Sequence, residues 1–260
     1  MLLALDIGNT NVTVGVFEGE RLRATFRLGT DVRRMPDEYA VFLLNLLPRE
    51  NIEPGQIRKA VIASVVPPLI SSFVELCKRY FSTAPVVVEA GVRTGVRILA
   101  DNPREVGADR VADSAAAFKL YGGPVIVVDF GTATAFDAIS RDGDYLGGAI
   151  APGIRIAAEA LFERASKLPR IDLVRPRSAV GRNTVSSMQS GLVFGYVGLV
   201  EGIVARMKKE LGPDAKVIAT GGNAEIIARE TTIFHDVNPD LTLIGLRLIY
   251  EINARAEAGR

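Results

Sequence analysis

Residues 3–11 read Leu-Ala-Leu-Asp-Ile-Gly-Asn-Thr-Asn, and this stretch decides the fold. The apolar run predicts a strand that ends near Asp6, and Gly8 follows in a loop of small polar residues. Glycine lets the backbone come close to a ligand or turn with positive φ, and successive N–H groups of such a turn can form a nest that binds an anion. Asp6 would repel a phosphate unless a cation lay between them, and Mg²⁺ commonly takes one or two carboxylates together with phosphate oxygens. The loop therefore predicts a site for a phosphate carried by Mg²⁺.

The same pattern occurs a second time, near the middle of the chain. Residues 127–134 read Val-Val-Asp-Phe-Gly-Thr-Ala-Thr, which places Asp129 and Gly131 each 123 residues after Asp6 and Gly8. Both copies are followed by a predicted strand, a turn that contains glycine, and another strand. The alternatives are a chance match between common strand–turn–strand units, or two tight hairpins without a ligand. We favour a duplication, which implies two similar domains with a cleft between them.

Strand and helix patterns alternate along the whole chain, and this alternation predicts an α/β protein. We expect domains at residues 1–118 and 119–260. The expected strands are residues 2–5, 12–17, 21–27, 59–64, 85–88, 125–129, 133–139, 145–150 and 216–220. The expected helices are residues 37–47, 67–80, 110–121, 154–164, 184–210 and 243–255.

The composition excludes several classes of function. The 260 residues carry 31 Lys and Arg against 30 Asp and Glu, so the net charge of +1 indicates neither a nucleic-acid surface nor a membrane-facing patch. The single cysteine, Cys77, excludes a disulfide or CxxC site and is expected in the core, and the single histidine, His235, cannot build a zinc cluster or a Ser-His triad. The apolar run at the N-terminus is interrupted by Asp6, so we do not expect export, and uncharged stretches such as residues 185–200 fall short of a membrane span. We therefore expect a cytoplasmic protein.

Other phosphate-binding signatures are absent. The chain has no GxxxxGK[ST] loop, no GxGxxG between a strand and a helix, and no catalytic His-Arg-Asp. Residues 217–223, Val-Ile-Ala-Thr-Gly-Gly-Asn, predict a strand, a glycine pair and a helix from about Ala224. Backbone could pass close to an adenine or a ribose there, but such turns are frequent.

Five blocks of sequence together resemble the type III pantothenate kinases, a family of the acetate and sugar kinase, heat-shock and actin superfamily. They appear in the family's order and, with Gly222, cover nearly the whole chain. The blocks are residues 6–11 (DIGNTN), 102–110 (NPREVGADR), 129–134 (DFGTAT), 147–153 (GGAIAPG) and 181–184 (GRNT).

This resemblance implies two duplicated actin-like (ribonuclease H-like) domains with an ATP cleft between them. It also implies transfer of the ATP γ-phosphate to the 4′-hydroxyl of pantothenate, the first step of coenzyme A synthesis. The implied cofactors besides ATP are Mg²⁺ and a monovalent cation, K⁺ or NH₄⁺, and the implied assembly is a homodimer. Residues 184–200 are a candidate interface, although a buried core helix fits their apolar pattern equally well.

The resemblance also assigns roles to single residues. Asp109 matches the general base, Asp6 would hold Mg²⁺-ATP, Asp129 would bind the monovalent cation, and Thr132 would hydrogen-bond the nucleotide. The residues that match the phosphate-wrapping segment are Gly8, Asn9, Thr10, Asn11 and Thr13. The residues that match pantothenate-contacting positions are Gly107, Ala108, Asp109, Arg110 and Thr184.

Simpler interpretations stay open for three of these residues. Asp109 could also be an acidic helix start, Arg110 could bridge the domains instead of binding a carboxylate, and Thr184 could be a helix cap. One position departs from the family: Ala100 stands where many members carry tyrosine, which puts the shape of the pantothenate pocket in doubt. The rival functions are another small-molecule kinase or a phosphatase of this superfamily and a non-catalytic, nucleotide-binding regulator.

Overall fold

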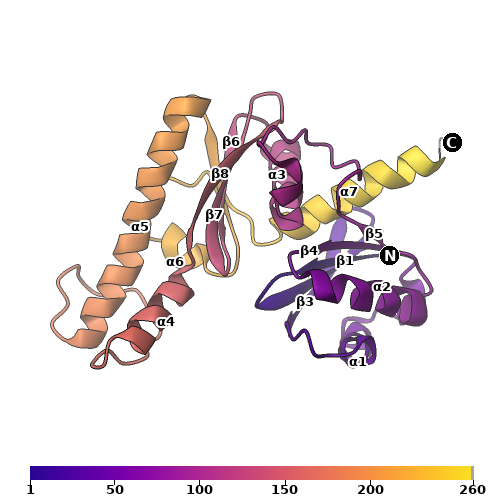
Figure 1. Ribbon diagram of the computed structural model, residues 1–260, viewed down its shortest axis with the longest axis horizontal. Helices are drawn as coiled ribbons and strands as arrows, with labels where there is room; N and C mark the ends of the chain where they lie inside the picture. The colour runs from indigo at the N-terminus through magenta and orange to yellow at the C-terminus, as the bar shows by residue number, and fades with distance from the viewer. Residues whose placement is uncertain (259–260) are drawn as a thin grey trace. The chain divides into compact units, whose positions relative to one another are not determined.

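The computed structural model describes residues 1–258 and divides into two units, which we describe one at a time (Figure 1). The first unit comprises residues 1–97 and 101–116 together with the last helix, α7 (Leu241–Ala258). The second comprises residues 98–100 and 117–240. The division falls within helix α3 (Ala108–Tyr121).

The sheet of the first unit has the strand order β3-β2-β1-β4-β5. Strand β2 pairs antiparallel with both β1 and β3, whereas β1, β4 and β5 are parallel. The strands are β1 (Leu2–Ile7), β2 (Asn11–Glu18), β3 (Arg21–Gly29), β4 (Lys59–Ser64) and β5 (Val86–Val87). The other helices of this unit are α1 (Pro36–Leu46) and α2 (Pro67–Phe81), with short 3₁₀ turns at Leu47–Glu50, Pro54–Gln56 and Pro103–Glu105.

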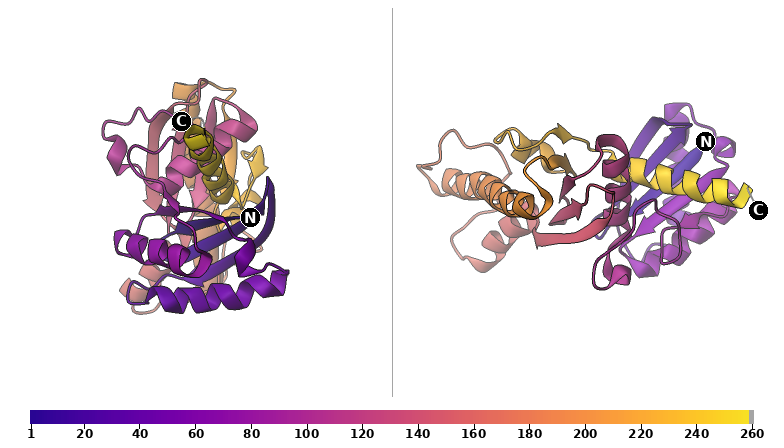
Figure 2. Two further views of the ribbon diagram at one scale, coloured as in Figure 1. Left: turned by 90° about the vertical axis from the view of Figure 1, so that its right-hand side faces the viewer. Right: turned by 90° about the horizontal axis from the view of Figure 1, so that it is seen from above.

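Side chains on the two faces of β1 enter two separate hydrophobic cores, as the two-residue period of a strand requires. Leu3 and Leu5 pack in one core with residues of α1 and α2 such as Phe73. Ala4 packs in the other with residues of α3 and α7 such as Leu246. Figure 2 shows α7 beside the strands of this unit. A sheet covered on both faces keeps the loop after β1 on a rigid support.

The sheet of the second unit has the strand order β8-β7-β6-β9-β10, read from its antiparallel edge. Its strands are β6 (Val125–Phe130), β7 (Ala133–Ile139), β8 (Tyr145–Pro152), β9 (Lys216–Thr220) and β10 (Asp236–Val237). Its helices are α4 (Ile154–Arg164), α5 (Thr184–Leu211) and α6 (Ala224–Ala228). Residues from β6, β9, α5 and α6 form its core.

The predicted duplication is confirmed. Each unit contains an antiparallel three-stranded hairpin sheet whose first strand pairs in parallel with a later strand, in the same order. Strand β6 begins and ends 123 residues after β1, so Asp6 and Asp129 occupy the same position in equivalent strands. The second strand of each hairpin sheet has a similar irregularity: the register shifts between Val16 and Phe17 of β2 and between Ala138 and Ile139 of β7. The α/β fold class is therefore confirmed as well.

Most predicted elements are confirmed, several with the predicted bounds, as for β4, β7, β9 and α4. The short β10 and the three 3₁₀ turns were not predicted. We expected residues 119–260 to form the second domain, but helix α7 packs against the sheet of the first unit and not the second. Its amphipathic pattern indicates an apolar face but cannot specify which sheet that face covers. Cys77 lies in the core, as expected.

Helix α5 is a core helix along one face. Leu192, Tyr196, Val200 and Val204 belong to the core of the second unit, while residues such as Val185 are exposed. By length and composition α5 would also qualify as a membrane span, with a mean hydropathy of 1.4 over a window that is 39% buried. The uncharged stretch of residues 185–200 is by itself shorter than a membrane span, as predicted, but the helix continues through charged residues to Leu211. Core helices of other proteins meet the same criterion, so it does not outweigh the packing.

Candidate active site

The loop between β1 and β2 forms the tight, polar turn that the sequence predicts. The backbone N–H of Gly8 donates to the carbonyl of Asn11 over 3.0 Å, and a Cβ at Gly8 would lie 3.1 Å from that oxygen. Asp6 is half-buried at the end of β1 and pairs in register with Thr13 of β2. The side chains of Asn9, Thr10 and Asn11 are exposed. The loop thus presents amide and hydroxyl groups beside one carboxylate.

Two neighbouring segments hold this loop in place, and the sequence analysis assigned neither. The hydroxyl of Thr30 donates to the carbonyl of Gly8 over 2.7 Å, and its backbone N–H donates to the carbonyl of Thr10 over 3.0 Å. The backbone N–H of Val65, just after β4, donates to the carbonyl of Ile7 over 3.1 Å. A hydroxyl directly after a strand was the only signal for Thr30, and hydroxyls in that position are common.

The start of α3 lies next to the same strand ends. A Cβ placed on Gly107 would be 2.4 Å from the Oδ1 atom of Asp109 and 3.4 Å from a side-chain carbon of Val65. Only glycine therefore leaves room for the Asp109 carboxylate in this position. Since Val65 also bonds to Ile7, the structure brings Gly107 and Asp109 close to the end of β1 and its loop.

Asp109 is half-buried at the start of α3. Burial raises the pKa of this carboxyl, while the backbone N–H of Arg110, which donates to Oδ1 over 2.8 Å, and the charge of Arg110 act in the opposite direction. Desolvation of this kind makes a carboxylate a stronger proton acceptor. Asp109 also lies in the first turn of α3, so the helix-start and general-base interpretations are compatible. Ala108 and Arg110 flank it and are half-buried.

Three glycines crowd around the equivalent loop of the second unit. Gly221, with φ of +90°, would place a Cβ only 2.2 Å from Oδ1 of Asp129, and a Cβ at Gly131 would lie 3.3 Å from Oδ2. A Cβ at Gly153 would lie 2.1 Å from the carbonyl oxygen of Thr132, to which the N–H of Gly153 donates over 3.1 Å. The backbone therefore forms a close cradle around the Asp129 carboxylate and Thr132.

The turn after β9 is anchored to this cradle. The backbone N–H and the side-chain amide of Asn223 both donate to the carbonyl of Phe130, over 3.3 and 3.2 Å. Arg155 in turn donates to Oδ1 of Asn223 over 2.8 Å. The glycine pair that the sequence placed near an adenine or a ribose is thus packed against Asp129. Arg155 and Asn223 were not predicted, because their roles depend on a contact between distant segments.

Thr184 stands apart from the other predicted site residues of the second unit. It is exposed in the first turn of α5, and among the described residues no hydrogen bond joins it to the loop of Asp129. The helix cap is its neighbour Asn183, whose Oδ1 accepts from the N–H of Ser186 over 2.9 Å. The cap interpretation of Thr184 was therefore wrong, and its hydroxyl is available to a ligand.

The residues present fit hard cations held by few protein oxygens. In residues 1–258 no group of three or more His, Cys, Asp or Glu side chains could hold a metal ion. Asp6 and Asp129 each supply one carboxylate at the end of a strand, beside backbone that comes close through glycine. Mg²⁺ in phosphate sites uses this kind of sparse protein coordination, completed by phosphate and water.

Solved structures of low sequence identity share this fold. The activator of the 2-hydroxyisocaproyl-CoA dehydratase from Clostridium difficile, solved with bound ADPNP, matches with a TM-score of 0.55 and 12% identity, covering 99% of this chain and 97% of that one. The ROK hexokinase from Thermus thermophilus matches with a TM-score of 0.52 and 13% identity, covering 97% and 99%. These likenesses show the actin-like fold of the ATPases and sugar kinases.

Sequence comparison gives the family. The family model for type III pantothenate kinase matches residues 2–206. The type III pantothenate kinase of Dehalococcoides mccartyi strain CBDB1 is 55% identical over 252 residues, 97% of this chain and 96% of that protein. The enzyme of the same name from Roseiflexus sp. strain RS-1 is 55% identical over 253 residues, covering 97% and 99%. With its paired Asp-x-Gly loops and a desolvated aspartate at the start of α3, this chain belongs to the type III pantothenate kinase family.

Proposed function

We propose that this chain transfers the γ-phosphate of ATP to the 4′-hydroxyl of pantothenate and so starts coenzyme A synthesis. The kinase activity follows from its family. The observation that carries the mechanism is the position of Asp109, whose desolvated carboxylate lies beside the end of β1 and the loop that follows it. A general base must lie within hydrogen-bond reach of the hydroxyl that it deprotonates, close to the phosphate that this hydroxyl attacks.

The site residues would have separate roles in the reaction. Gly8, Asn9, Thr10, Asn11 and Thr13 would wrap the phosphates, and Thr132 would hydrogen-bond the nucleotide. Asp109 would accept the proton of the 4′-hydroxyl as the new P–O bond forms, while Gly107 keeps space for that carboxylate. Arg110 would bind the pantothenate carboxylate, for which a guanidinium offers a planar pair of donors. Ala108 and Thr184 would complete the contacts to pantothenate.

Asp6 would hold Mg²⁺ with ATP, and Asp129 would hold the monovalent cation, K⁺ or NH₄⁺. When bound, these cations neutralise the phosphate charge that the two carboxylates would otherwise repel. The cradle of glycines around Asp129 supports this assignment, since it keeps the carboxylate fixed and leaves no room for another side chain on that side. We further propose that the protein is cytoplasmic, as its family of metabolic enzymes suggests.

The test of this proposal is the formation of 4′-phosphopantothenate by the purified protein with Mg-ATP in K⁺, NH₄⁺ or Na⁺ buffer. We expect product in K⁺ or NH₄⁺ and little in Na⁺. Asp129→Asn should lose this preference among cations. If the folded protein binds nucleotide but makes no product with any cation, the kinase assignment fails, and a regulatory role or another substrate replaces it.

We also propose that two copies of the chain form a homodimer through the second unit. Large apolar side chains are exposed on β8 and α4, including Ile150 at 66% and Phe162 at 40% of their surface, and at the start of α5, where Val185 is 41% exposed. Such a patch is more typical of an interface than of a monomer's surface. Light scattering should give twice the mass of the chain, and Ile150→Glu should shift it toward the monomer. A wild-type monomer at micromolar concentration would contradict the proposal.

A further inference from the structure

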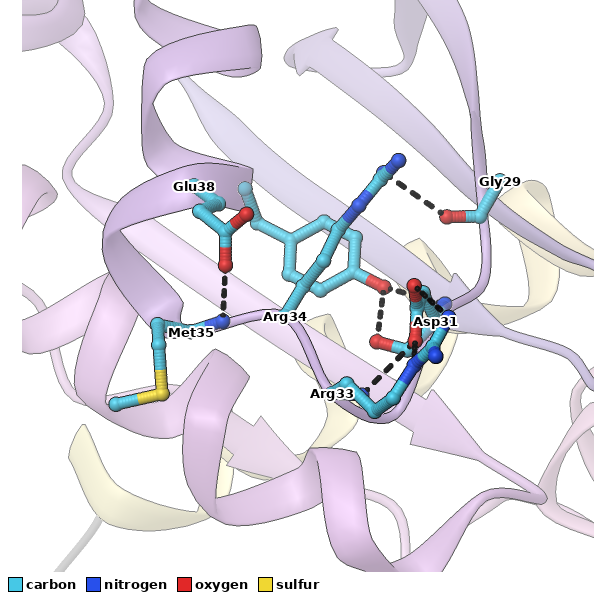
Figure 3. Close-up of polar contacts among 7 residues, drawn as sticks. Gly29, Asp31, Arg33, Arg34, Met35 and Glu38 are labelled. Atoms are coloured by element: carbon cyan, nitrogen blue, oxygen red, sulfur yellow. Dashed lines mark hydrogen bonds and ion pairs between the residues drawn. The ribbon is translucent and has the colours of Figure 1, made fainter.

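A pocket of about 510 Å³ opens on the first unit beside the β1–β2 loop, and no site described above accounts for it. Asn9 of that loop forms part of its wall, and the remaining wall is mostly the segment between β3 and α1. This segment includes Thr30, whose hydroxyl and N–H hold the loop of Gly8 and Thr10. It also places Asp31, Arg33 and Arg34 around the pocket (Figure 3).

The charges of Asp31 and Arg33 cancel each other. The carboxylate of Asp31 accepts hydrogen bonds from the Arg33 backbone N–H over 3.0 Å and from its Nε and Nη2 atoms over 3.1 and 3.2 Å. These bonds hold the pKa of Asp31 below its usual range. The hydroxyl of the buried Tyr39 fixes the backbone of Asp31 by accepting from its N–H over 2.9 Å and donating to its carbonyl over 3.1 Å. The pair therefore adds no net charge to the wall of the pocket.

Arg34 is the positive charge that remains. Its guanidinium lies over the ring of Phe42, 5.2 Å from the centroid, and 5.8 Å from the centroid of Tyr39. One nitrogen reaches the carbonyl of Gly29 at 3.4 Å, as Figure 3 shows. Among the side chains of residues 1–256, which the structure describes, no carboxylate forms an ion pair with Arg34. The side chain is thus oriented by two aromatic rings while most of its N–H donors are left for a ligand.

We propose that Arg34 is a phosphate-binding residue of the nucleotide site. A phosphate on the backbone of the β1–β2 loop would border the pocket, because Asn9 belongs to both. A guanidinium matches phosphate with paired N–H donors, and its attachment to the rings reduces the entropy lost on binding. The inference rests on the proposed function in assuming that the loop after β1 holds nucleotide phosphates.

The test is the affinity of the full-length protein for ATP, ADP and AMP, measured by calorimetry without pantothenate so that no turnover occurs. Arg34→Gln should weaken ATP binding about tenfold or more, the scale for hydrogen bonds to charged groups. AMP, which lacks the outer phosphates, should be affected less than twofold. Arg34→Lys should fall between wild type and Arg34→Gln, because it keeps the charge and loses the planar donors.

Two matched variants separate this role from general surface charge. Asp31→Asn with Arg33→Gln removes a balanced pair from the same pocket, so ATP affinity should stay within about twofold of wild type. Arg79→Gln removes another arginine stacked on a tyrosine, Tyr80, and paired with Asp37, and should also have little effect. Equal ATP affinity in wild type and Arg34→Gln, or an equal loss for AMP, would overturn the proposal.

The outcomes also distinguish this inference from the proposed function. If ATP binds and depends on Arg34 but pantothenate is not phosphorylated, the substrate assignment fails and the role of Arg34 stands. If pantothenate is phosphorylated and Arg34→Gln binds ATP like wild type, only the role of Arg34 fails. A wild-type protein that binds no ATP would contradict both.

Discussion

Replacing Asp109 with asparagine should lower kcat for pantothenate phosphorylation by at least about a hundredfold, the scale of a general base. Asparagine keeps the size of the side chain, and its carbonyl oxygen can still accept from the N–H of Arg110, so the start of α3 should be preserved. The KM for ATP should change little, because the variant keeps the loop after β1. Steady-state kinetics with saturating K⁺ measure both quantities.

Glu105→Gln is the matched control for this variant. Glu105 is an exposed carboxylate a few residues away that accepts from the side chain of Asn102, and a glutamine can accept the same bond. Its kcat should remain within about twofold of wild type. An Asp109→Asn enzyme that keeps more than a tenth of wild-type kcat would show that Asp109 is not the base.

The dependence on pH follows from the raised pKa of Asp109. The base accepts a proton only when ionised, so kcat/KM should fall as the pH drops through this raised pKa, earlier than for an ordinary aspartate. The residual activity of Asp109→Asn should not show this fall at low pH. Burial disfavours the ionised form in the folded state, so ionised Asp109 destabilises the fold. This destabilisation is absent at low pH, where the carboxyl is protonated in both states. It develops as the pH rises above the unfolded pKa and is complete above the folded pKa. Asp109→Asn should therefore melt higher than wild type at neutral pH, with the difference vanishing in acid.

Replacing Gly221 with alanine should destabilise the second unit by about 2 to 5 kcal/mol, the sum of a left-handed backbone penalty and an overpacked contact. The new Cβ would lie 2.2 Å from Oδ1 of Asp129 and 2.7 Å from backbone atoms of Phe130. The backbone of Phe130 cannot shift at low cost, so the Asp129 side chain must move away from the new Cβ. The same change should weaken the activation by K⁺ that we propose for Asp129. Denaturant unfolding and a K⁺ titration of activity measure the two effects.

Gly91→Ala separates the two contributions. Gly91 has a similar φ of +100°, but a Cβ there would meet nothing within 4 Å. This variant should cost only about 1 to 2 kcal/mol, the backbone penalty alone, and leave K⁺ activation unchanged. If Gly221→Ala is no less stable than Gly91→Ala, the close packing of the cradle is not as described.

The sequence by itself determined the two repeated units and the place of their carboxylates. A run of apolar residues that ends in Asp-x-Gly is a local signal, and its recurrence after 123 residues predicts two equivalent strands, which β1 and β6 are. Local periodicity likewise predicted α4 and β4 with their observed bounds. The loop residues from Gly8 to Asn11 could be named for the same reason, since turn chemistry depends on neighbours in the chain.

Only the tertiary structure decided which distant segments support these loops. It placed α7 on the first sheet, Val65 between the end of β1 and the start of α3, and Arg34 in the wall of the same pocket as Asn9. It also showed that a residue larger than glycine at position 221 would collide with the Asp129 carboxylate. An apolar helix face or a lone glycine indicates that another segment will pack closely against it, but it does not identify that segment. Hydrophobic burial is non-directional, so the partner depends on how the whole chain folds.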